Sequence, residues 1–422
     1  MCRLKYDHKR IIVCLCGVFF ITAFIIRAAL SGITYDEAFT YLAYVIPLDE
    51  SFSLRTLMNI YYESLANNHW INTLLIALTV RLTGIHYSEF IIRIPALLFG
   101  CFYVFICSKE FLKNELNLME YSLLMGCYYL NEFFSLARGY CQAAVLILCG
   151  LLLYRKYLKF EEKNYLLVLS LGFLLASAYA NSVTLVICFA LGCVIIYRLI
   201  RSKRLWSFIK RTFPILIVYA VFALAILKYH FKISAPGLPL YYAEKTTILG
   251  VISEYTGMVF AGPLTTVMSI LLLILFPAGI IYLVAVKKFE KCDLSVSFII
   301  YMVCIISMDA IFGRGGFTGR TLLPAFPLFV LGCSELFSKV YLSITEKKKA
   351  PLSIAIKALS VLFVLTLIVC FFTKIDLTRT SDWYEDYDIR DDYYYHPEDL
   401  PQYDHASIRF YEEKSIYYSE NS

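Results

Sequence analysis

The chain has 422 residues, of which 59% are hydrophobic and 17% are charged, and its formal net charge is +6. With a mean hydropathy of +0.66, this composition excludes an ordinary soluble globular protein. Apolar runs near the ~20 residues that cross a bilayer recur along the whole sequence, so we expect a polytopic membrane protein without a large soluble domain.

The first apolar run, residues 11–30, follows a basic stretch that contains Arg3, Lys5, Lys9 and Arg10. Such a segment is either a signal peptide or a retained helix with a cytoplasmic flank. The run is longer than the apolar part of a signal peptide, and the following RAALSGITY is an imperfect cleavage site. We therefore favour a retained helix and a cytoplasmic N-terminus.

Later basic clusters decide the predicted topology, because positive residues favour the cytoplasmic side. If residues 70–85 crossed the membrane, every cluster would lie outside, whereas all lie inside if this stretch lies along the surface. Its short length, Asn72 and Arg81 also favour an interfacial helix. Eleven transmembrane helices are then predicted, at about 11–30, 92–108, 119–137, 141–157, 164–181, 183–199, 212–230, 263–286, 294–312, 320–341 and 352–373.

The predicted fold is thus all-α, with a transmembrane domain over residues 1–373. Its first extracytoplasmic loop, 31–91, carries an acidic motif and juxtamembrane helices, and residues 374–422 form an acidic, Tyr-rich tail on the same side. The tail is too aromatic for typical disorder, so we expect it to fold back on the outer surface. The 14 cysteines lie almost entirely in apolar runs, which indicates packing residues, and no Cys/His pattern indicates a metal.

Polar residues gather on the predicted outer face. They are Asp36, Glu37, Asn68, His69, Arg93, Arg138, Asp309, Arg314 and Arg320. Arginines at outer helix ends oppose the positive-inside trend, and a lipid phosphate would explain them because guanidinium groups bind phosphate oxygens in a bidentate way. Snorkelling or helix-end ion pairs are the alternative for any single arginine, and both interpretations stay open.

This face suits group transfer from a lipid-linked donor, since no phosphate-binding Gly-rich loop is present. A carboxylate would take the proton of the acceptor hydroxyl, and cations would stabilise the departing phosphate. Asp36 can be that base. Glu37, as the next residue, points elsewhere and is more suited to orienting the site or binding the acceptor. Alternatively, the acidic pair caps the helix that begins at this point.

Five stretches resemble, in their order, the GT-C superfamily of membrane glycosyltransferases. They are TYDEAFTY, NNHWINTLL, GIHYSEFIIRIPALLFG, FSLARGYCQAAVLIL and GRTLLPAFPLFVL. The most similar branch contains protein O-mannosyltransferases and aminoarabinose transferases, whose donors are polyprenyl- or dolichyl-phosphate sugars. The resemblance implies an extracytoplasmic active site and one displacement, with inversion, at the anomeric carbon.

The resemblance also implies roles for single residues. Asp36 matches the family's catalytic acid and Glu37 the second acid of that motif. His69 matches a His or Glu near the site, although Trp70 stands here in place of a proline. Asn68 precedes it in the same stretch and belongs to the predicted substrate-binding set.

Three arginines match family positions. Arg93 matches the Arg of an RxP motif, which is structural or close to the donor. Arg138 lies in the ARGY turn, after which many members carry an Asp that is absent here, so a second acid or metal site is unsupported. Arg320 matches an Arg that opens a late helix and is the candidate donor-phosphate ligand, with Arg314 as a weaker one.

We therefore expect a glycosyltransferase that moves a sugar from a polyprenyl-phosphate donor to a hydroxyl of a glycan, lipid or protein acceptor. A bacterial cytoplasmic membrane is the expected location, with membrane lipids as partners and no nucleic acid. The sequence assigns no cofactor and leaves a divalent cation open. The alternatives are a lipid-linked polysaccharide ligase or polymerase and a secondary transporter, although a transporter should show more broken helices at the midplane.

Overall fold

The computed structural model describes residues 2–63, 69–160, 163–233, 247–312, 319–345, 351–375, 377 and 405–420. Within these ranges every regular element is helical and no strand occurs. In the part of the chain that the structure describes, seven helices are long and apolar enough to cross a membrane: Lys9–Leu30, Glu89–Leu112, Gly139–Lys159, Ser182–Arg201, Leu205–Lys232, Pro263–Ala285 and Gly319–Ile344. Four shorter apolar helices are Trp70–Thr83, Asn164–Ala180, Asp293–Ser307 and Leu362–Lys374. The all-α, multi-pass membrane class is confirmed, whereas the count of eleven spans stays a prediction.

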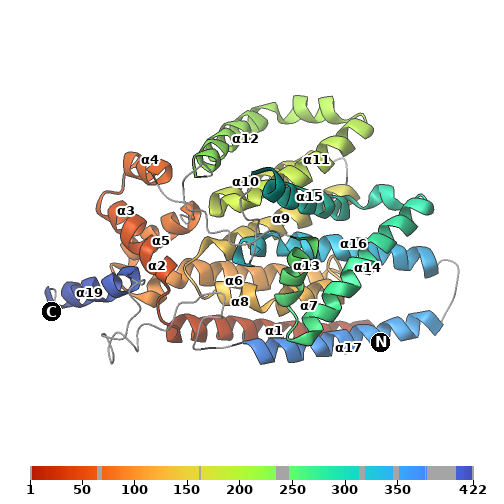
Figure 1. The fold of residues 1–422 in the computed structure, drawn as a ribbon, viewed down its shortest axis with the longest axis horizontal. Coiled ribbons are helices and arrows are strands. Elements are labelled where there is room, and N and C mark those ends of the chain that lie inside the picture. The colour runs from red at the N-terminus through yellow and green to blue at the C-terminus, as the bar shows by residue number, and fades with distance from the viewer. Residues whose placement is uncertain are drawn as a thin grey trace.

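Most of the long helices lie along the long axis of the molecule and form its body (Figure 1). They are α1 (Cys2–Leu30), α6 (Glu89–Leu112), α9 (Gly139–Lys159), α10 (Asn164–Ala180), α11 (Leu185–Arg201), α12 (Leu205–Ile233), α14 (Pro263–Ala285), α15 (Asp293–Phe312), α16 (Phe326–Thr345) and α17 (Pro351–Lys374). Shorter elements between them are α7 (Leu118–Gly126), α8 (Tyr128–Phe133), α13 (Ile248–Gly257) and the 3₁₀ turns η2 (Ser182–Thr184), η3 (Phe289–Lys291) and η4 (Gly319–Ala325).

Helix α9 is the centre of the bundle and packs against α6, α10, α16 and η4. Its residues Ala143, Ile147 and Leu151 are fully buried. By contrast, α12 and α14 expose large apolar side chains, including Phe222 and Ile281. Such exposed apolar faces are typical of helices that contact lipid.

The segment predicted as one span at 119–137 is instead two short helices, α7 and α8, separated at Cys127. Cys127 adopts an extended backbone, with φ −69° and ψ 94°. The amide of Tyr128 donates to the carbonyl of Met258 (3.1 Å), and the Asn131 side chain donates to the carbonyls of Met125 and Cys127 (both 2.8 Å). Because these contacts replace helical hydrogen bonds, the backbone can bend inside the bundle.

One end of the bundle is covered by short helices, which we name the end cap (left in Figure 1). Its elements are α2 (Tyr35–Thr40), the π-helical η1 (Tyr41–Val45), α3 (Ile46–Glu50), α4 (Leu54–Glu63), α5 (Trp70–Thr83) and the C-terminal α19 (His405–Glu420). Helix α19 packs on α2, and its Phe410 and Tyr411 are fully buried in a cluster with Tyr41. An ion pair joins Lys414 to Glu89 at the start of α6 (3.0 Å). Residues 31–63 and 69–83 therefore share one small core with the last helix.

The other end of the bundle, which we name the basic end, holds the lysines and arginines that close α9 and α11. Their ion pairs are Arg155–Glu120 (2.8 Å), Lys156–Glu110 (2.8 Å), Lys159–Glu115 (2.7 Å), Arg198–Asp293 (3.1 Å) and Arg201–Glu290 (2.8 Å). Lys9 belongs to this end, because it donates to the carbonyl of Phe111 (2.7 Å). The part of α1 from Lys9 to Leu30 separates the two ends by roughly 30 Å.

Candidate active site

The acidic motif begins helix α2 through a reciprocal cap. The amide of Glu37 donates to the side chain of Thr34 (3.3 Å), and the amide of Thr34 donates to the carboxylate of Glu37 (3.0 Å). Two amides that lack helical partners are satisfied in this way. The capping interpretation therefore holds for Glu37, while Asp36 takes no part in the capping box.

Glu37 is also clamped by Arg93 of α6. Nε and Nη2 of Arg93 donate to the two carboxylate oxygens at 2.8 and 2.7 Å, and both side chains are fully buried. The remaining donors of Arg93 go to the carbonyls of Ala28 (3.1 Å), Ser31 (2.7 Å) and Gly32 (2.5 Å). Because a guanidinium has five N–H donors, none is left for a ligand. These contacts favour a structural role for Arg93 and a positioning role for Glu37.

The same carboxylate fixes the turn that carries Arg138. The amide of Ala137 donates to Oε1 of Glu37 (2.6 Å). On its other side, the carbonyl of Ala137 accepts from Asn72 of α5 (2.7 Å), and Gln142 of α9 donates to Asn72 (2.7 Å). The backbone of Ala137, the residue before Arg138, is therefore held directly by α2 and α5, and Gln142 of α9 holds Asn72 in place.

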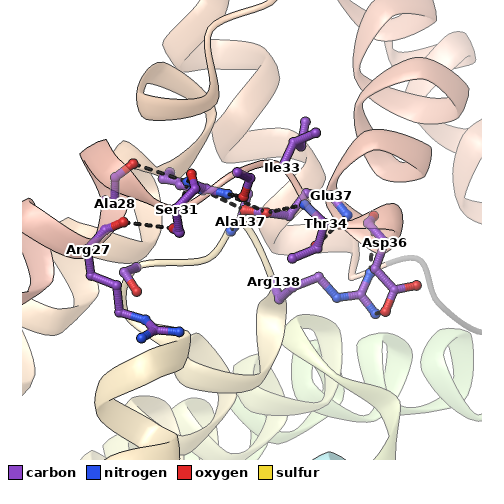
Figure 2. Close-up of polar contacts among 12 residues, drawn as sticks. Arg27, Ala28, Ser31, Ile33, Thr34, Asp36, Glu37, Ala137 and Arg138 are labelled. Carbon is purple, nitrogen blue, oxygen red and sulfur yellow. Dashed lines mark hydrogen bonds and ion pairs between the residues drawn. The ribbon is translucent and has the colours of Figure 1, made fainter. Parts of the chain in front are cut away.

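Asp36 faces away from Glu37 and toward Arg138 (Figure 2). Its Oδ2 lies 3.0 Å from Nη2 of Arg138 and 2.9 Å from Nη1 of Arg320. The side chain of Arg138 is 1% exposed, whereas that of Arg320 is 27% exposed. One carboxylate oxygen thus joins α2, the start of α9 and η4, and Arg320 is the partner that a ligand can reach.

His69 and Gly139 meet at the edge of this cluster. His69 precedes α5, is buried, and lies edge-on to the ring of Tyr140, with 4.7 Å between the ring centroids. A Cβ on Gly139 would lie 2.4 Å from the carbonyl oxygen of Ala180 and 2.5 Å from Cβ of His69. Only glycine allows α9 to begin this close to both segments.

Charge and burial set the protonation states around the cluster. Burial raises the pKa of Glu37, but the charge and hydrogen bonds of Arg93 outweigh it and hold the pKa below the ordinary value of 4.5. Burial and the charges of Arg138 and Arg320 lower the pKa of His69 well below 6.5, against a hydrogen bond to the Ala180 carbonyl. His69 is therefore neutral at neutral pH, and its buried Nε2 has no hydrogen-bond partner among the described residues. The cluster of Asp36, Arg138, Arg320 and His69 then carries one net positive charge.

The structure brings four of the predicted site residues together: Asp36, His69, Arg138 and Arg320. Glu37 and Arg93 lie behind them as a buried support. Asn68 and Arg314 lie outside the described residues. Sequence reasoning gave no role at this site to Asn72, Gly139 and Gln142, because ordinary packing residues of these types carry no local signal.

Within the described ranges, no group of three or more His, Cys, Asp or Glu side chains is placed to hold a metal ion. The neighbours of Asp36 are cationic, which suits an anion better than a metal. The cysteines whose side chains are described are free thiols.

Comparison with models of protein families, with curated proteins and with solved structures found no match to this chain.

Proposed function

We propose that this protein is a membrane glycosyltransferase that moves a sugar from a polyprenyl-phosphate donor to an acceptor hydroxyl on the extracytoplasmic face. The observation that carries the proposal is the contact of Asp36 with Arg138 and Arg320. A carboxylate that faces two guanidinium groups combines a proton acceptor with a phosphate-binding pair. The resemblance of the surrounding sequence to the GT-C superfamily supports the same chemistry.

The position of the cluster fits a donor that lies in the membrane. Asp36 follows α1, Arg138 precedes α9 and Arg320 opens the last long apolar segment with η4, so all three lie at ends of candidate spans. A lipid phosphate and a water-soluble hydroxyl can meet at such a boundary. The basic end lies on the far side of the bundle, and the positive-inside rule assigns that end to the cytoplasm. The proposed site then faces outward.

The proposed reaction is one displacement at the anomeric carbon. The acceptor oxygen forms a bond to this carbon while the bond from the carbon to the phosphate oxygen breaks, and the electron pair leaves with the polyprenyl phosphate. The acceptor proton passes to Asp36. Arg320 and Arg138 stabilise the negative charge on the phosphate, and neutral His69 can accept a hydrogen bond from a substrate hydroxyl through Nε2.

In the absence of a donor, Asp36 is paired with both Arg138 and Arg320. Arg320 is the more exposed partner, and a donor phosphate can draw its guanidinium away from Oδ2. Donor binding would then free the carboxylate just where the acceptor hydroxyl arrives. This order couples phosphate binding to base activation.

The test is transfer of radiolabelled sugar from polyprenyl-phosphate donors to endogenous acceptors, in membranes with matched expression. We expect Asp36→Asn to abolish most labelling, with a loss of at least 100-fold for removal of a general base. Arg320→Gln should weaken donor use, with a raised donor KM. The control is Glu412→Gln, which removes an exposed carboxylate of α19. Equal labelling by the wild type and Asp36→Asn, with the protein intact, would overturn the proposal.

A further inference from the structure

A second site lies in the end cap, away from the Asp36 cluster. A cavity of about 170 Å³ opens between η1, α3, the stretch before α6, and α19. Its polar and aromatic lining consists of Tyr41, Asp49, Glu50, His86, Tyr87 and Tyr417. At about 30 Å³ for each water, the cavity has room for roughly five or six water-sized groups, enough for a small ammonium group.

The aromatic walls are fixed in place by the protein. The ring of Tyr87 lies 5.4 Å from that of Tyr41 and 5.6 Å from that of Tyr417, and His86 lies 5.3 Å from Tyr417, all between centroids. The hydroxyl of Tyr41 accepts the amide of Tyr87 (3.0 Å), and the hydroxyl of Tyr87 donates to Glu413 (3.1 Å). Tyr41 is buried and forms the back wall of the cavity, whereas Tyr87 and Tyr417 are partly exposed and can contact a ligand.

The charges that line the cavity are negative. Asp49 is half-buried and Glu50 is exposed at the rim, and no Lys or Arg occurs among the described residues of the lining. Nδ1 of His86 lies 3.9 Å from Oδ2 of Asp49, which is too long for a hydrogen bond. Burial and then the neighbouring carboxylate Glu413 raise the pKa of Tyr87 to about 12, with a smaller contribution from Glu50. Burial accounts for the largest part of this rise, so the negative charge of the lining comes from the carboxylates of Asp49 and Glu50 themselves.

We propose that this cavity binds an ammonium group, held by the rings of Tyr87 and Tyr417 against the buried Tyr41 and by the carboxylates of Asp49 and Glu50. Aromatic faces attract ammonium ions through the ring quadrupole, and carboxylates add charge and hydrogen-bond acceptors. A phosphate or carboxylate ligand is disfavoured by the two carboxylates. The proposal does not depend on glycosyl transfer at Asp36.

The ammonium group has two accessible sources. Tyr87 lies two residues before α6, a candidate membrane span, so the head group of an ethanolamine phospholipid is within reach. The exposed rim at Glu50 equally admits a soluble amine, such as an amino sugar. Both present the same chemistry to the tyrosine rings.

The first experiment measures binding of tetramethylammonium to the purified full-length chain, in nanodiscs of phosphatidylglycerol, against sodium at equal ionic strength. We expect saturable binding that Tyr417→Leu or Asp49→Asn weakens by roughly three- to thirtyfold. Tyr417→Phe should keep wild-type affinity because it retains the ring face, and Glu412→Gln serves as the charge-matched control. Absence of saturable binding, or binding that both weakening variants leave unchanged, would overturn the proposal.

A second arm separates the two sources, using nanodiscs that contain phosphatidylethanolamine. Weaker tetramethylammonium binding in these discs means that the lipid head group competes for the cavity and is its ligand. Equal binding in both kinds of disc assigns the cavity to a soluble amine. Thermal unfolding of each variant tests whether the end cap is still folded. We expect Tyr417→Phe and Asp49→Asn to be folded, because both changes nearly preserve the side-chain volume.

Discussion

Neutralisation of the adjacent carboxylates should have different main effects, on stability for Glu37 and on sugar transfer for Asp36, and Glu37→Gln gives the sharper test. Glu37 accepts four hydrogen bonds: two from Arg93 (2.8 and 2.7 Å), one from Ala137 (2.6 Å) and one from Thr34 (3.0 Å). A glutamine in its place would turn its amide N–H₂ group toward N–H groups that now donate to Glu37. It would also leave the guanidinium of Arg93 buried without a carboxylate partner. Removing one partner of a buried ion pair costs about 3–5 kcal/mol. This is a large share of the total stability of a typical domain.

Asp36→Asn should cost less stability than Glu37→Gln, about 1–3 kcal/mol, because the buried Arg138 keeps its hydrogen bond to the main-chain carbonyl of Asp36 (3.4 Å) and the asparagine oxygen can still accept from it. Arg320 is 27% exposed and can turn toward water, which reduces the penalty of losing its partner. We expect Glu37→Gln to lower the midpoint of thermal unfolding clearly more than Asp36→Asn, measured on purified protein in one detergent. Asp36→Asn should nevertheless be the variant with the larger loss of sugar transfer per folded molecule.

A double-mutant cycle with Arg93→Gln separates the ion pair from other effects of each change. Residues in direct contact typically show a coupling of about 0.5–3 kcal/mol, and the upper part of this range is expected for Glu37 and Arg93. If the effects of the two changes on the unfolding free energy were additive, Glu37 and Arg93 would not form the proposed buried ion pair. A smaller loss of stability in Glu37→Gln than in Asp36→Asn would refute the division of roles between the two acids.

Two further predictions concern the support of the site and its dependence on pH. Gly139→Ala should cost about 1–3 kcal/mol, because its Cβ would lie 2.4 Å from the Ala180 carbonyl oxygen, and should reduce transfer through displacement of His69. Gly192→Ala, where a Cβ meets nothing within 4 Å, is the matched control, and equal thermal unfolding of the two variants would contradict the close contact. The difference in unfolding free energy between the wild type and Glu37→Gln should not depend on pH well above 4.5. Glu37 is then ionised in both the folded and the unfolded chain, because its unfolded pKa is 4.5 and its folded pKa is lower. This difference in unfolding free energy should become smaller as the pH falls from 4.5 through the folded pKa of Glu37. A difference that grows with acid in thermal unfolding experiments would show that folding does not lower the pKa of Glu37.

The class of the protein and much of its local structure can be predicted from the amino-acid sequence alone. Apolar runs of bilayer length predict membrane helices whatever their partners are, because the bilayer core leaves backbone groups no alternative to internal hydrogen bonds. The acidic pair Asp36–Glu37 predicts a helix start, and the structure has one there, with a capping box that involves only the neighbouring residues Thr34 and Glu37. Arg138 and Arg320 stood out because their charges oppose the topology of the rest of the chain.

Only the tertiary structure decided which partner each acid has. Asp36 and Glu37 are neighbours in sequence, yet Glu37 takes Arg93 and Asp36 takes Arg138 and Arg320. The break at Cys127 and the packing of α19 on α2 likewise depend on residues far away in the chain. These choices follow from burial and from the geometry of guanidinium groups on separate helices, and side-chain periodicity along one helix contains no information about them.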